Sequence, residues 1–167
     1  MTEILEKKSQ PIDFAGLKDY FEQSLTPGQR ADIRVNDPDD LELRPTFYRL
    51  IGKFLPKGAK PGGNWKRVVY FLPYAAHADK ADRLGAAFAH AGVREIRMMQ
   101  LERFESPHDL IQLRRLMQHV KPTVNWNQFG ASLYYWNDEN KRQLLKDYLH
   151  AKYIDKKGKG ENHEEGE

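Results

Sequence analysis

The sequence predicts an all-α protein, a helical bundle of about eight helices arranged in two lobes. Two observations lead to this prediction. Apolar residues recur at spacings of three and four along most of the 167 residues, and no two segments read as strands that could pair. Helix-start residues and glycine or proline stop signals divide the chain into short helices. We expect an N-terminal lobe at residues 1–90, a C-terminal lobe at residues 91–154 and a disordered tail at residues 155–167.

The first lobe begins with a helix whose N-cap residue is Asp13. The apolar stripe of this helix repeats every three or four residues and consists of Phe14, Leu17, Phe21 and Leu25. Prolines at the first helical position predict three further helices, which begin at Pro27, Pro38 and Pro45. A loop rich in glycine and proline follows at residues 56–63.

Residues 64–77 are ambiguous, because they could contain a short buried strand. We expect a helix, since no partner strand is recognisable and a lone strand is not stable. Two short helices follow, one at residues 82–92, which closes on Gly92, and one at residues 94–104.

A longer helix is predicted to begin at Ser106 and to end at Pro122. Ser106 as N-cap, Pro107 at the first helical position and Asp109 three residues after the cap form the pattern of a capping box. Two more helices complete the series, at residues 123–136 and 139–153.

The composition excludes several classes of protein. The chain has no cysteine, which rules out a disulfide framework, a thiolate metal site and a cysteine nucleophile, and favours a reducing compartment. The N-terminus lacks the pattern of a signal peptide, and the longest apolar run is far shorter than the roughly 18 residues that a membrane span needs. We therefore expect a cytoplasmic protein.

Enzyme chemistry has little support in the sequence. The six histidines have no metal-ligand spacing, and neither a phosphate-binding glycine loop nor a nucleophile elbow occurs. The carboxylate pairs Asp39-Asp40 and Asp138-Glu139 stand at predicted helix starts, where the helix dipole favours negative charge. We expect no enzymatic activity, no metal and no cofactor.

The positive charge is concentrated in the middle of the chain. Residues 41–121 carry a net charge of +8, whereas residues 1–40 carry −4 and residues 122–167 carry −1. A basic segment of this kind is typical of proteins that bind nucleic acid or polyphosphate, because neutralising phosphates supplies most of the affinity that is independent of sequence. The alternative is that the cations only solvate helix faces, and charge alone does not separate the two.

Aromatic residues lie among these cations, as in single-strand binders that combine a basic groove with stacking platforms. Most aromatic residues of a helical bundle belong to the core, so the prediction of nucleic-acid binding rests on the cations. Winding the helix 110–120 at 100° per residue places its leucines on one stripe, with Arg115 almost opposite and Arg114 at the boundary. We expect Arg114 to tie the helix into the bundle through a carboxylate and Arg115 to be the better candidate for a phosphate.

Three segments resemble the CasB family, the small subunit of the type I-E CRISPR Cascade surveillance complex. They are LELRPTFYRLIGKF (41–54), LIQLRRLMQHVKPTVNW (110–126) and RQLLKDY (142–148), in the same order and at similar spacing. The similarity runs over roughly residues 30–150 and covers neither the acidic N-terminus nor the tail.

The resemblance implies an all-helical, two-lobed, non-catalytic protein of antiviral defence, present as two copies in a complex built on a guide RNA. It implies contacts with the backbone subunits, the large subunit and a second copy. It also implies a basic surface that binds nucleic acid and stabilises the R-loop, including the displaced strand of the target DNA.

The family's nucleic-acid role carries over to Arg49, Arg67, Arg97, Arg103, Arg114 and Arg115. The neighbouring cations Lys66 and Lys121 are added as candidates. Where related sequences can show a basic pair this chain has Asp138-Glu139, so Lys141 and Arg142, one turn later, are the candidates to substitute.

Two other functions stay open. In the first, the chain is a purely architectural subunit whose basic face docks on acidic protein surfaces while its neighbours hold the nucleic acid. The second, a free-standing helix-turn-helix regulator, is weaker, because no helix gathers exposed Arg, Asn and Gln at its N-terminal end as major-groove readout requires.

Overall fold

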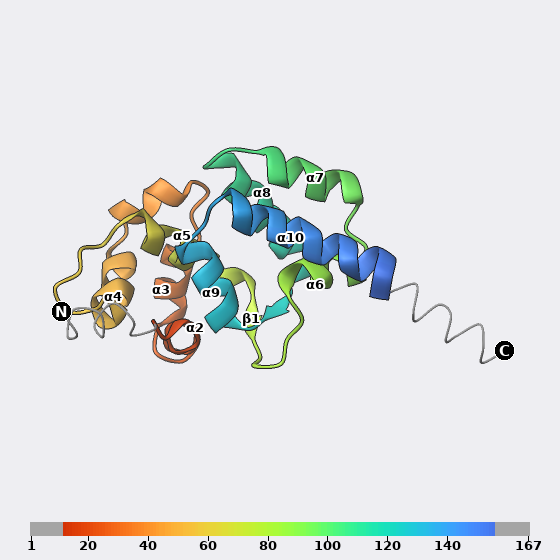
Figure 1. Cartoon of the computed structure of the whole chain (residues 1–167). Helices are drawn as coiled ribbons and strands as arrows, with labels where there is room; N and C mark the ends of the chain where they lie inside the picture. Colours follow the sequence, from red (N-terminus) through yellow and green to blue (C-terminus); the bar gives the residue numbers. More distant parts are fainter. Residues whose placement is uncertain (1–11, 156–167) are drawn as a thin grey trace, which may run out of the picture.

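The computed structural model describes residues 12–155, and this part of the chain is largely helical (Figure 1). Its α-helices are α2 (Phe14–Gln23), α3 (Pro27–Asp32), α4 (Pro45–Phe54), α5 (Gly63–Phe71), α6 (Leu84–His90), α7 (Glu95–Arg103), α8 (His108–Val120), α9 (Trp126–Tyr134) and α10 (Asp138–His150). Two 3-10 helices, η1 (Pro38–Leu43) and η2 (Leu72–Tyr74), and a π-helical turn, η3 (Ala151–Asp155), complete them. The all-α prediction is confirmed.

The expectation that no strands pair was wrong. Strand β1 (Ala76–His77) pairs in parallel with β2 (Thr123–Val124). The backbone N–H of Ala76 donates to the carbonyl oxygen of Pro122 at 3.2 Å, and that of Ala78 donates to Val124 at 3.0 Å. Strands of two residues are too short to produce a periodic pattern in the sequence, and their pairing depends on the surrounding helices.

The helices surround one continuous apolar core. Helix α10 packs along α6 and α7, α7 packs on α8, and α9 packs on both α2 and α5 (Figure 1). The largest side chains that this packing buries completely include Trp65, Tyr70, Phe71, Phe88 and Trp126. The expected division into two lobes at residue 90 stays a prediction.

Local start signals were confirmed for the early helices. The Asp13 carboxylate accepts the N–H of Gly16 at 2.8 Å. Thr26 and Gln29 form a complete capping box in front of α3. Pro38 and Pro45 open η1 and α4 as predicted.

The predicted capping box of the longer helix was wrong. Helix α8 begins at His108, with Pro107 in the cap position and no side-chain cap bond. The Ser106 hydroxyl instead donates to the Asp109 carboxylate at 3.0 Å. Asp109 is buried, and its carboxylate also contacts Trp136 and Lys141. Sequence spacing does not reveal these two partners, which hold the carboxylate in a position other than that of a capping box.

The predicted tail at residues 155–167 lies, apart from Asp155 in η3, outside the described residues. Within residues 12–155, no helix combines the length and apolar character needed to cross a bilayer.

Candidate nucleic-acid interface

Arg114 is a buried residue that connects two segments of the fold. Only 8% of the residue is exposed. Its guanidinium donates to the carbonyl oxygen of Val35 at 2.7 Å and to the side-chain oxygen of Asn36 at 2.8 Å, and lies 5.5 Å from the centre of the Tyr70 ring. The expected boundary position is confirmed, but the partners are neutral oxygens rather than the carboxylate that we expected. Arg114 therefore joins α8 to the segment between α3 and η1.

Arg67 closes the end of helix α9. Its Nε donates to the carbonyl oxygen of Leu133 at 2.6 Å and its Nη2 donates to that of Tyr134 at 2.7 Å. Burial lowers the pKa of this guanidinium. Cations at helix C-termini satisfy carbonyl groups that have no partner within the helix.

Lys66 is neutralised by acids of η1. Its ammonium lies 2.9 Å from a carboxylate oxygen of Asp39 and 2.9 Å from one of Glu42. The hydrogen bond to Glu42 is the largest cause that raises the pKa of Lys66. These contacts leave little positive charge for an external phosphate.

Lys141 is buried in a polar cluster between α8 and α10. Its ammonium donates to the carbonyl oxygen of Phe104 at 2.7 Å and lies 3.4 Å from the Asp109 carboxylate. That carboxylate also accepts the indole N–H of Trp136 at 2.9 Å. Because the nearest acid is itself buried, Lys141 completes an internal ion pair. The predicted nucleic-acid role stays a prediction for the four cations that are buried or paired inside the fold: Lys66, Arg67, Arg114 and Lys141.

The remaining predicted cations are exposed. Within residues 12–155, no carboxylate lies within ion-pair distance of the side chains of five of them: Arg49, Arg97, Arg103, Arg115 and Lys121. The exposure of Arg115 is as the helical winding predicted. Arg142 is exposed too, and its Nε lies 3.9 Å from a carboxylate oxygen of Glu102.

The structure gathers these exposed cations on a few elements. Arg97 and Arg103 lie on α7, whereas Arg115 and Lys121 lie on α8 and at its end, and the two helices pack on each other. Arg142 reaches toward α7 from α10. Arg49 stands apart on α4, which lies away from α7 and α10 in Figure 1.

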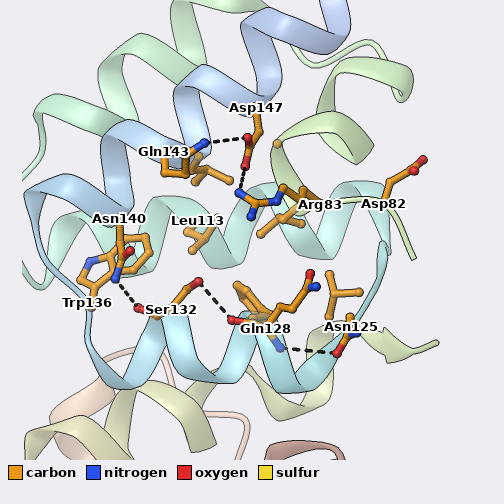
Figure 2. Close-up of a pocket in the computed structure, with 15 residues that line it drawn as sticks. Asp82, Arg83, Leu113, Asn125, Gln128, Ser132, Trp136, Asn140, Gln143 and Asp147 are labelled. Atoms are coloured by element: carbon orange, nitrogen blue, oxygen red, sulfur yellow. Dashed lines mark hydrogen bonds and ion pairs between the residues drawn. The ribbon is translucent and has the colours of Figure 1, made fainter. Parts of the chain in front are cut away.

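A pocket between α6, α8, α9 and α10 contains none of the predicted residues. Its volume is about 310 Å³, and Figure 2 shows Gln128 and Ser132 on one wall facing Gln143 and Asp147 on the other. At its rim the Arg83 guanidinium donates to Asp147 at 3.2 Å. The sequence did not predict this pocket, although Asn and Gln recur there at a spacing of three, at residues 125 and 128 and again at 140 and 143.

No cluster of three or more His, Asp or Glu within the described range could hold a metal ion. Arg97, Arg103 and Arg115 could each contact a phosphate without first breaking an ion pair within the described residues, so α7 and α8 offer cations to a polyanion.

The comparisons with known proteins agree with one another. The chain is 34% identical over 139 residues to the CRISPR system Cascade subunit CasB of Escherichia coli (strain K12), which covers 76% of this chain and 87% of the relative. It also resembles a chain in the crystal structure of E. coli Cascade bound to a PAM-containing double-stranded DNA target. In that comparison the TM-score is 0.78 and the identity 33%, over 85% of this chain and 99% of the other. No protein-family model matches the chain.

Proposed function

The chain belongs to the CasB family, and we propose that it serves as the small, non-catalytic subunit of a type I-E CRISPR Cascade complex. In this proposal it binds nucleic-acid backbone through its exposed cations and stabilises the R-loop, in which guide RNA pairs with one DNA strand and displaces the other. Strand exchange of this kind is nearly balanced in free energy, so contacts to phosphates can tip it.

One observation carries the proposal. The predicted cations separate into those used inside the fold and those left exposed, and the exposed set includes Arg97, Arg103 and Arg115 on two helices that pack together. Exposed arginines without acidic partners contribute little to folding stability. A polyanionic partner gives them a function.

The partners follow from the family. We propose that the chain contacts the backbone subunits, the large subunit and a second copy of itself, with guide RNA and both target strands nearby. The relative in the solved structure comes from a complex with double-stranded DNA, which supports nucleic acid as a partner.

The proposal can be tested by reconstituting Cascade with a subunit that carries Arg97→Gln, Arg103→Gln and Arg115→Gln. We expect the complex to assemble at normal stoichiometry but to open target DNA at least about tenfold less well, because three phosphate contacts are lost. A matched control, Lys80→Gln with Lys146→Gln, removes exposed lysines outside the predicted set and should open DNA normally. Normal opening by the triple variant would contradict the proposal.

An architectural role is the second candidate, and a specific observation favours it. Helix α7 exposes Ile96 and Met99 on the same side as Arg103, and Phe104 follows at its end. Exposed apolar residues beside cations are typical of protein interfaces. If the triple variant fails to assemble, although its isolated chain melts like the wild type, the basic face docks on protein.

A further inference from the structure

Tyr48 is an exposed aromatic ring held rigidly on α4. The residue is 48% exposed, whereas its neighbour Phe47 is buried. The Tyr48 hydroxyl donates to the carbonyl oxygen of Glu42 at 2.8 Å, and its ring packs edge-on against Phe47 at 5.2 Å. The contact with Phe47 and the hydrogen bond of the hydroxyl thus restrict the orientation of the ring. Fixing an aromatic ring in advance lowers the entropy that a stacking partner would otherwise lose.

Gly52 leaves this ring uncovered. A side chain four residues later on a helix lies over the preceding turn, which here carries Tyr48. Position 52 has no side chain, and a Cβ atom built there would meet no atom within 4 Å. Glycine weakens a helix interior, so position 52 lowers helix stability while it places no side chain one turn after Tyr48.

Cations are frequent in the segment that carries Tyr48. Residues 43–78 contain seven lysines and arginines and no acidic residue. Arg49 and Lys53 are both exposed on α4, and the Lys53 ammonium lies 4.9 Å from the centre of the Tyr20 ring. The nearest acid upstream, Glu42, is bonded by Lys66. The segment that carries Tyr48 is therefore positively charged.

We propose that Tyr48 is a stacking platform for an unpaired nucleobase, with Arg49 and Lys53 contacting the phosphates on either side of that base. This inference deepens the proposed function and rests on it, because it names a site and a type of contact on α4. Proteins that hold single strands combine aromatic platforms with a basic surface.

The test compares the affinity of the protein for two fluorescein-labelled single-stranded DNAs of equal length. One consists of thymidines, and the sugars of the other carry no bases. Both have the same phosphates, so only the first can stack. With the full chain, we expect Tyr48→Ala to weaken binding of the thymidine strand about 5- to 100-fold and binding of the abasic strand less than about 2-fold. The dependence on salt should not change, because no phosphate contact is removed.

Three further variants make the result specific. Tyr48→Phe keeps the ring but loses the hydrogen bond to Glu42, and should bind the thymidine strand more tightly than Tyr48→Ala but less tightly than the wild type. Gly52→Leu keeps Tyr48 but covers its ring, and should lose affinity for the thymidine strand only. Tyr153→Ala is the matched control: Tyr153 is 54% exposed, and its hydroxyl donates to Glu95 at 2.7 Å, but it lies on η3 at the other end of the molecule (Figure 1).

The outcomes separate the two proposals. If the wild type binds with salt dependence but Tyr48→Ala and Gly52→Leu bind the thymidine strand normally, the stacking platform is wrong and the proposed function stands. Equal loss on both strands would also overturn the platform, since the ring would then act through the phosphate contacts. If the wild type binds neither strand at low salt, the proposed function fails, and the platform fails with it.

Discussion

Arg114 and Arg115 are adjacent in the sequence but have different surroundings. Arg114 is buried against Val35 and Asn36, whereas Arg115 is exposed. Helical winding predicted this difference, since it depends only on the period of the helix. It did not predict the partners of Arg114, because Val35 lies 79 residues away in the chain and only tertiary packing brings the two together.

Arg114→Met should therefore lower the free energy of unfolding by about 2 to 4 kcal/mol, since charged hydrogen bonds are lost and the carbonyl group of buried Val35 is left without this donor. Arg115→Met on the same helix is the matched control and should change stability by less than about 0.5 kcal/mol. Urea unfolding of both variants measures this. Equal effects would contradict the different roles that we assign.

Tyr70 should make stability depend on alkaline pH. The residue is buried, and burial raises the pKa of its phenol from 10.0 to about 12. Between these two values the unfolded chain loses the phenolic proton while the folded chain keeps it, so stability falls as pH rises, by up to about 1.4 kcal/mol per pH unit.

Tyr70→Phe removes the ionising group. Its stability should start about 1 kcal/mol lower, because the hydroxyl no longer donates to Asn36, but should fall less steeply above pH 10. The difference between the two proteins, measured by urea unfolding at several pH values, isolates Tyr70 from other titrating groups. Parallel pH profiles would show that Tyr70 is not the source.

At the scale of elements, the sequence predicted most helices because their signals are local. Asp13, the Thr26 capping box and the prolines at positions 38 and 45 each act within one helical turn. The pairing of β1 with β2 was missed, and Ser106 and Asp109 were wrongly predicted to form a capping box. Both depend on long-range packing, which brings Trp136 and Lys141 to the Asp109 carboxylate.

The contact between α6 and α10 gives a prediction at this scale. A Cβ atom at Gly85 would lie 2.8 Å from the Asp147 Cβ and 2.8 Å from the backbone nitrogen of Tyr148, so Gly85→Ala should destabilise the protein by about 1 to 3 kcal/mol. Gly52→Ala, also within a helix but with open space around it, should instead stabilise it by about 0.5 to 1 kcal/mol. Thermal melting of both variants checks the signs.

In the whole molecule, the sequence shows where positive charge is concentrated, but not which cations are exposed and able to bind a partner. A cation count cannot show that Lys66 is held by Asp39 and Glu42, or that Lys141 is paired with buried Asp109. It also cannot show that the Tyr48 ring is open, because that depends on which side of α4 faces solvent. Only the folded chain separates cations that hold the structure from those free to bind a partner.

We propose that the exposed cations bind nucleic-acid backbone, and the most direct test of this claim is the salt dependence of single-stranded DNA binding by the full chain. The logarithm of affinity should fall with the logarithm of salt concentration, with a slope of about −0.7 for each phosphate contacted. In the variant with Arg97→Gln, Arg103→Gln and Arg115→Gln, that slope should be shallower by up to about 2. A wild-type affinity independent of salt, or a triple variant with the wild-type slope, would contradict the claim.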